Sequence, residues 1–268
     1  MTPATDAIEA LAGLANPFAA PSSEEDRLFA DAMAAADAWH RARNPRYAAL
    51  WDENTRPLLP VGLFKRADLA TPVDDGGETL RSSGTTSGQG TPVFFDARSM
   101  ARIRQGMLHI FMRAGYFDLR PANFLVLAPD PAQGDHPGYA TAFTRFTDCA
   151  PQREVVYAVD ADGQFSAARA WEALRRFADE ANTLFVFGLT VWFEHLALAA
   201  DAPVPLRGPL RGLTGGGWKG LARTLDRPEI VARLTAHYAG AIGDWRSDFC
   251  SSELEAHGNC CAAGRFHL

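Results

Sequence analysis

Residues 82–90 combine the two residue types that bind phosphate groups through backbone and hydroxyl donors. The segment reads Ser-Ser-Gly-Thr-Thr-Ser-Gly-Gln-Gly, so every residue except Gln89 is a glycine or carries a hydroxyl group. Glycine lets the backbone approach a ligand closely and adopt positive φ, and successive N–H groups form a concave nest for anionic oxygens. The segment therefore predicts a nucleotide-phosphate loop, and the alternative is a flexible Gly/Ser linker.

Two widespread phosphate loops do not match this segment. A Walker A loop carries a lysine directly after its second glycine, and no lysine follows the glycines here. The dinucleotide fingerprint Gly-x-Gly-x-x-Gly begins at Gly88, but Val93 stands where the third glycine belongs. Neither pattern is complete.

Two further segments carry residue types suited to a nucleotide site. Residues 214–219, Thr-Gly-Gly-Gly-Trp-Lys, offer close backbone approach, a ring for stacking and a cation; the alternative is a turn with a surface lysine. Residues 249–253, Phe-Cys-Ser-Ser-Glu, place a hydroxyl beside a carboxylate. Such oxygen ligands suit Mg²⁺, although the same residues alone would form a helix N-cap.

The elements that would position these segments alternate between apolar strands and amphipathic helices. We expect strands at 93–95, 123–128, 154–159, 183–188 and 211–214, and helices at 24–43, 99–114, 139–147, 166–180, 191–200 and 228–241. Residues 58–65 read as an extended apolar stretch. This alternation predicts an α/β fold with helices on both faces of a sheet. Ligands of such sheets bind outside the carboxyl ends of strands, where the glycine triplet falls.

Length and charge limit the class of protein. The chain has 268 residues and a net charge of −6, which disfavours a nucleic-acid surface. It contains no run of 18 apolar residues and begins without a secretory signal, so we expect a cytoplasmic protein that does not span a membrane. Its four cysteines, Cys149, Cys250, Cys260 and Cys261, are expected to be free thiols.

The order of the three segments resembles that of the adenylate-forming enzymes, the acyl- and aryl-CoA synthetase superfamily. Their phosphate loop, [Ser/Thr]-Ser-Gly-Thr-Thr-Gly, is similar to residues 82–86, with Ser87 intervening before Gly88. Their later motif, Tyr-Gly-x-Thr-Glu, is similar to residues 249–253. Within the superfamily, Thr-Gly-Gly-Gly-Trp-Lys is similar to the acyl-protein synthetases of the bacterial bioluminescence fatty-acid reductase system. Leu63-Phe64-Lys65 and Cys261-x-x-Gly264-x-x-His267 also resemble that family, and the resemblance spans residues 45–268.

The resemblance implies an N-terminal helical segment at 1–45, then a large ATP- and acyl-binding domain at 46–268 with mixed sheets flanked by helices. It implies catalytic roles for Thr85 and Glu253, with Mg²⁺ held by Glu253. Ser252 would contact the phosphate of the adenylate, and Phe249 would lie near the adenine. The residues implied to bind ATP or the adenylate are Ser82, Ser83, Gly84, Thr85, Thr86, Gly88, Gly215, Gly216, Gly217, Trp218, Phe249 and Ser252.

The implied activity is ATP-dependent activation of a fatty or other carboxylic acid, with transfer of the acyl group to a protein thiol on a partner such as a reductase subunit. One alternative is an aryl-CoA ligase of the phenylacetate type. Another is a nucleotide- or acyl-binding partner protein without catalysis.

The sequence departs from the family pattern in several places. Gln89 stands where the family loop carries a basic residue, and Phe249 and Cys250 replace the tyrosine and glycine of the later motif. The small C-terminal lid domain, with its adenylation lysine, has no counterpart within these residues, so we expect a C-terminally truncated chain that is inactive alone. The alternative for the Cys/His-rich end is a structural zinc site, with the candidate ligands Cys250, His257, Cys260, Cys261 and His267.

Overall fold

The computed structural model describes the residue ranges 3–14, 22–53, 55–73, 77–81, 92–113, 115–133, 138–200, 202–216, 218, 222–238, 242–251 and 256–259. Its helices are α1 (Pro3–Ala12), α2 (Ser23–Arg43), α3 (Pro45–Ala48), α4 (Ala97–Arg113), α5 (Gly138–Thr147), α6 (Ala167–Ala178), α7 (Thr190–Leu198) and α8 (Arg227–His237), with 3₁₀ turns η1 (Val61–Lys65) and η2 (Pro131–Gln133). Its strands are β1 (Gly77–Arg81), β2 (Pro92–Asp96), β3 (Ala122–Pro129), β4 (Gln152–Val159), β5 (Leu184–Leu189), β6 (Leu210–Gly215), β7 (Ile242–Ser251) and β8 (Ala256–Asn259).

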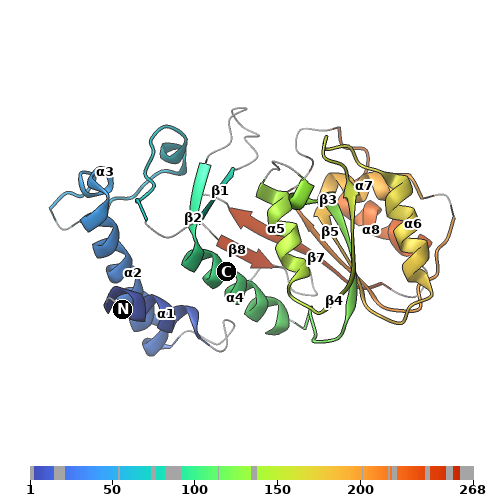
Figure 1. Cartoon of the computed structure of the whole chain (residues 1–268), viewed down its shortest axis with the longest axis horizontal. Helices are drawn as coiled ribbons and strands as arrows, with labels where there is room; N and C mark the ends of the chain where they lie inside the picture. Colours follow the sequence, from blue (N-terminus) through green and yellow to red (C-terminus); the bar gives the residue numbers. More distant parts are fainter. Residues whose placement is uncertain are drawn as a thin grey trace.

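The main sheet has six strands in the order β4-β3-β5-β6-β7-β8 (Figure 1). The pairs β4–β3, β3–β5, β5–β6 and β6–β7 are parallel, and β8 is antiparallel to β7. Helices therefore connect the successive parallel strands from β3 to β7, because a parallel pair needs a crossover connection. The α/β class expected from the sequence is confirmed.

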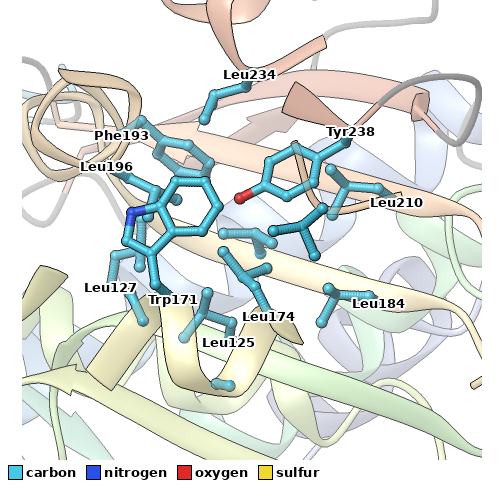
Figure 2. Packing of buried hydrophobic residues seen from close by; sticks show 14 of the residues in the cluster. Leu125, Leu127, Trp171, Leu174, Leu184, Phe193, Leu196, Leu210, Leu234 and Tyr238 are labelled. Carbon is cyan, nitrogen blue, oxygen red and sulfur yellow. The ribbon is translucent and has the colours of Figure 1, made fainter. Parts of the chain in front are cut away.

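Strand β3 shows why both faces of the sheet need helices. All eight of its residues are buried, and successive side chains point to opposite faces. Leu125 and Leu127 join one core cluster, whereas Phe124 and Val126 join a second one. Helices α6, α7 and α8 cover the first cluster, where Trp171 and Tyr238 stack at 5.8 Å between ring centroids (Figure 2). Helices α4 and α5 contribute to the second cluster.

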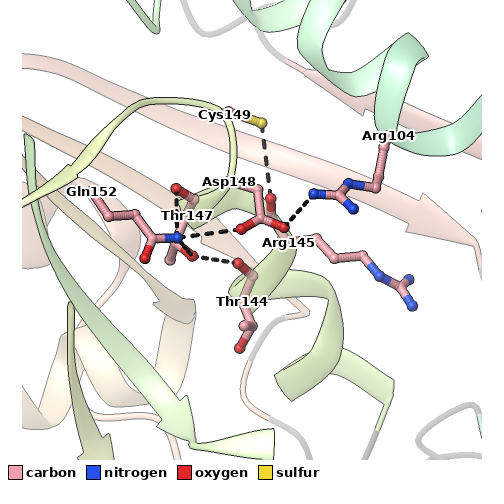
Figure 3. Close-up of polar contacts among 7 residues, drawn as sticks. All are labelled: Arg104, Thr144, Arg145, Thr147, Asp148, Cys149 and Gln152. Carbon is pink, nitrogen blue, oxygen red and sulfur yellow. Dashed lines mark hydrogen bonds and ion pairs between the residues drawn. The ribbon is translucent and has the colours of Figure 1, made fainter. Parts of the chain in front are cut away.

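Polar contacts connect α4, α5 and the start of β4 on the second face. Arg104 of α4 pairs with Asp148 at 2.8 Å, and the Gln152 amide donates to the carbonyl and hydroxyl oxygens of Thr147 (Figure 3). The β1–β2 hairpin is tied to the same helix pair, because Arg145 of α5 pairs with Glu78 of β1. These contacts hold the hairpin beside the main sheet.

The N-terminal helices lie at the hairpin side of the molecule (Figure 1). Helix α2 begins with a capping box, in which Ser22 accepts from the Glu25 N–H and Glu25 accepts from the Ser22 N–H. Helix α1 packs against α2 and reaches α4, where Glu9 and Arg102 pair at 2.7 Å. The division at residue 45 stays a prediction, although α3 begins there at Pro45.

Two sequence expectations need correction. Residues 61–65 form the 3₁₀ turn η1 rather than an extended stretch, because Pro60 starts a turn in which its carbonyl accepts from the Leu63 N–H at 2.8 Å. Strands β1, β7 and β8 were not expected. Residues 242–251 lack the continuous apolar run that identified the inner strands β3 and β5.

Candidate functional site

The order of the parallel strands defines where a ligand of this sheet would bind. Strand β3 comes first in the chain, β4 lies on one side of it, and β5 lies on the other. The connections therefore reverse direction between β3 and β5, which is a topological switch point. Open α/β sheets bind ligands in the crevice outside the carboxyl ends of the strands at such a point. The carboxyl edge formed by β3, β5 and β6 is therefore the candidate site.

The two strands at the switch point approach each other closely. A Cβ atom on Gly188 of β5 would lie 2.5 Å from the Cβ of Leu127 and 2.9 Å from its carbonyl oxygen, so no side chain fits there. After β3, the Asp130 carboxylate accepts from the Ala132 N–H and from the Gln133 amide. After β5, the buried Thr190 starts α7. The switch point thus combines a bare backbone with short polar side chains.

The glycine segment lies one strand from this switch point. Gly215 ends β6 and pairs with Leu189 of β5, directly before Thr190. Gly216 follows with φ +66 and is exposed. Only glycine adopts this left-handed conformation readily, so the chain can turn at the edge of the sheet and present its backbone. The structure therefore places Gly215 and Gly216 at the carboxyl edge, while Gly217 lies outside the described residues.

A buried carboxylate holds the segment that follows the glycines. Glu194 of α7 is 1 % exposed, and its Oε2 accepts from the Trp218 indole N–H at 2.9 Å. Its Oε1 accepts from the backbone N–H groups of Thr224, at 2.6 Å, and Leu225. The guanidinium of Arg223 lies 4.8 Å from the centre of the Trp218 ring. One face of this indole thus carries a cation, so an adenine ring could stack only on the opposite face.

The hydrogen bonds keep Glu194 ionised. Burial alone would raise the pKa of this carboxyl group, but the N–H groups of Leu225 and Thr224 and the Trp218 indole lower it, so the net shift is downward. A carboxylate that accepts several N–H bonds is stabilised in its charged form. Glu194 therefore acts as a fixed negative clamp that joins α7 to Trp218, Thr224 and Leu225.

Sequence reasoning did not find Glu194. The available signal was one acidic residue in the apolar run Val-Trp-Phe-Glu-His-Leu of residues 191–196. Its neighbour His195 is an exposed side chain on the surface of α7. Its ring lies against Trp192, with 5.2 Å between centroids. His195 therefore belongs to a helix surface and not to the buried clamp.

The later motif begins on the strand next to the glycine segment. Strand β7 runs parallel to β6, with Thr214 opposite Ser247. The pairing ends there, because β6 stops at Gly215 while β7 continues to Ser251. Phe249 then pairs with Gly258 of β8. Ser252 and Glu253, which follow β7, lie outside the described residues, so their expected contacts with phosphate and Mg²⁺ stay predictions.

The expected phosphate loop joins β1 to β2. These strands pair in antiparallel fashion, from Gly77 opposite Asp96 to Arg81 opposite Pro92. The strand expected directly after the loop is thus confirmed as β2. The loop residues Ser82, Ser83, Gly84, Thr85, Thr86 and Gly88 lie outside the described residues. Helix α4 continues from β2 and contacts β8, so the helix that follows the first motif lies beside the strand that follows the third motif.

Within the described ranges, no group of three His, Cys, Asp or Glu side chains could hold a metal ion. Cys260, Cys261 and His267 of the Cys/His-rich end lie outside those ranges. The described cysteine Cys149 is a buried free thiol whose pKa is raised to about 12, chiefly by burial. It is therefore no candidate nucleophile, because the thiolate is the reactive form.

No family model matches this sequence, and no curated protein matches it either. The described helices include none with the length and apolar character needed to cross a membrane.

Proposed function

We propose that this chain binds ATP at the carboxyl edge of its sheet and activates a carboxylic acid as an acyl-adenylate. The observation that carries the proposal is the pairing of β6 with β7, the strands that carry the glycine segment and the start of the later motif. Strands β6 and β7 are paired neighbours, and α4, which extends from the loop-bearing hairpin, contacts β8. The glycine segment and the start of the later motif thus belong to paired strands, next to the edge where α/β sheets bind ligands.

The proposed reaction needs positioning and charge stabilisation more than a protein nucleophile. A carboxylate oxygen attacks the α-phosphorus of ATP, the new oxygen–phosphorus bond forms, and pyrophosphate leaves with the electron pair of the broken bond. Backbone N–H groups and hydroxyls of residues 82–88 would hold the phosphates. The open backbone at Gly215 and Gly216 would let the nucleotide approach the sheet edge, and Glu194 would keep the following segment in place through Trp218.

The donor types of the later motif suit magnesium. A serine hydroxyl and a glutamate carboxylate, at Ser252 and Glu253, are hard oxygen ligands, and Mg²⁺ takes one or two carboxylates together with substrate phosphates. When bound, the metal would neutralise charge on the phosphates. In the proposed acyl-protein synthetase activity, the sulfur of a thiolate on a partner protein such as a reductase subunit would then attack the acyl carbon. A thioester would form as the bond from that carbon to the phosphate oxygen breaks and AMP leaves.

ATP binding is the first test, because every phosphate-binding residue named here lies in this chain. We expect isothermal titration with Mg²⁺ and ATP to detect binding, and the double variant Thr85→Val with Thr86→Val to weaken it about 10-fold or more through lost hydrogen bonds. The control is Thr235→Val, which removes an exposed hydroxyl on α8. Equal affinities of the double variant and the control would refute the role of the loop.

Exchange between ATP and pyrophosphate then tests the reaction in a protein that also carries the lid domain implied by the resemblance, because these residues alone are expected to be inactive. Exchange that depends on an added carboxylic acid would establish adenylation, and the loop double variant should slow it about 100-fold or more, the typical effect of losing a transition-state donor. Glu253→Gln should weaken the Mg²⁺ dependence, with the exposed Glu172→Gln as its control. ATP binding without any exchange, over acids of all chain lengths, would reject catalysis and leave a nucleotide-binding protein.

A further inference from the structure

A cavity of about 780 Å³ lies away from the carboxyl edge of the main sheet, between the N-terminal helices and the β2–α4 junction. Its walls come from α2, from residues 64–73, and from β2 with the first turns of α4, while Ile8 of α1 closes one side. The volume falls within the range of small-molecule sites, about 300–1,000 Å³. None of the described residues of the three motifs lines this cavity, and its ligand is inferred below from the cavity's own residues without the proposed function.

Large apolar side chains form much of the wall. Trp39 and Phe64 are half-buried, and Phe94 of β2 is 37 % exposed although it lines the cavity. Leu69 and Val93 add aliphatic surface. Apolar surface left in contact with water inside a concave site favours a ligand that covers it, at about 25 cal/mol per Å² buried. The ligand therefore has an apolar body.

Most of the charges that line the cavity already have partners. Arg102 pairs with Glu9 of α1 at 2.7 Å, and Arg98 lies 3.9 Å from the same carboxylate. Asp96 caps α4 by accepting from the Ser99 N–H at 2.6 Å. Asp68 accepts from the Ala70 N–H and faces Arg46 at 4.0 Å. These groups hold one another, and they leave little net charge for a ligand to balance.

Arg66 is the exception among the charged residues of the cavity. Its side chain is exposed and, within the described part of the chain, it has no acidic partner. A single carboxylate can bond a guanidinium through two parallel N–H···O bonds, and it would balance one unpaired positive charge. A phosphate monoester carries up to two charges and would leave one of them without a partner here.

We propose that this cavity is a binding site for an amphipathic monocarboxylate, with its apolar body against Trp39, Phe64 and Phe94 and its carboxylate on Arg66. The Glu9 carboxylate on Arg102 shows that carboxylates fit the arginines of this cavity. A ligand bound in this way fills the space between the N-terminal helices and β2, so it would also join these two parts of the fold.

The test is isothermal titration of the whole chain with laurate, in the absence of nucleotide. We expect laurate to bind and Arg66→Gln to weaken it about 10-fold or more, the effect of losing one charge-assisted hydrogen bond. The control is Arg120→Gln, which changes an exposed arginine outside the cavity. A larger side chain in the wall, Ala36→Trp, should abolish binding, and its circular dichroism spectrum would show whether the variant is folded.

Two matched probes define the head group. Dodecanol has the same apolar body without the charge, and dodecyl phosphate carries a dianionic head; both should bind more weakly than laurate. Equal binding of laurate by Arg66→Gln and wild type, or tighter binding of dodecyl phosphate, would overturn the proposal. The Thr85→Val, Thr86→Val variant should bind laurate normally, so a failure here is distinguishable from a failure of the ATP site.

Discussion

Replacing Glu194 by alanine should destabilise the fold by about 3–4 kcal/mol. The substitution leaves three donors without their acceptor. The Leu225 N–H is buried, and an unsatisfied buried donor costs about 2 kcal/mol. The Thr224 N–H and the Trp218 indole are only partly buried, so water replaces the carboxylate and each loss is about 0.5–1 kcal/mol. The measurement is urea denaturation followed by circular dichroism.

The matched control is Glu172→Ala on α6, which removes a carboxylate of the same type from an exposed position. Its effect should stay within about 0.5 kcal/mol, as for surface substitutions in general. Equal losses in the two variants would refute the reasoning, since the buried hydrogen bonds would then contribute nothing beyond an ordinary surface charge.

The effect of Glu194 should also depend on pH with a defined sign. Because the pKa of Glu194 is lowered in the folded state, its contribution is complete above the ordinary glutamate pKa of about 4.3. That contribution is lost as the pH falls through the lower pKa of the folded protein. The stability difference between wild type and Glu194→Gln should therefore shrink in acid; a difference that grows on acidification would contradict the clamp.

Two further substitutions test the backbone and the core. Gly216→Ala should lower the free energy of unfolding by about 1–2 kcal/mol, because the left-handed φ of +66 disfavours a side chain. Its control, Gly106→Ala in the middle of α4, meets no atom within 4 Å and should instead raise stability by about 0.5–1 kcal/mol, so effects of equal sign in urea melts would contradict the assignment. Leu174→Ala, in the fully buried core of α6, should destabilise by about 2–5 kcal/mol in the same assay, and a loss below about 1 kcal/mol would mean that the cluster is not closely packed.

The elements of the main sheet could be predicted where burial leaves a strong local pattern. Residues 184–189 of β5 are all buried and read as an unbroken apolar run, so the strand was identified nearly to its ends. Helix α2 carries its own start signal in Ser22 and Glu25. Strands β7 and β8 carry no such run; β7 is a strand because β6 offers an edge to pair with, and β8 in turn pairs with β7. This strand pairing is a tertiary contact, so the local sequence of β7 and β8 does not indicate it.

Some features of the candidate site can likewise be predicted from the local sequence, whereas others depend on contacts between residues that are distant in the sequence. The residue type of Gly215 and Gly216 is enough to predict that a ligand can approach the backbone closely there. Glycine also permits the left-handed φ that the structure shows at Gly216. The local sequence does not indicate which side chain holds the segment that follows these glycines. Glu194 lies 24 residues before Trp218 and 31 before Leu225, in a helix whose pattern only indicates burial. A buried carboxylate is retained only where donors from elsewhere surround it, so its role could be assigned only after α7 was placed beside the turn. The strand order makes the same point, because the switch point between β3 and β5 exists only once both neighbours of β3 are known.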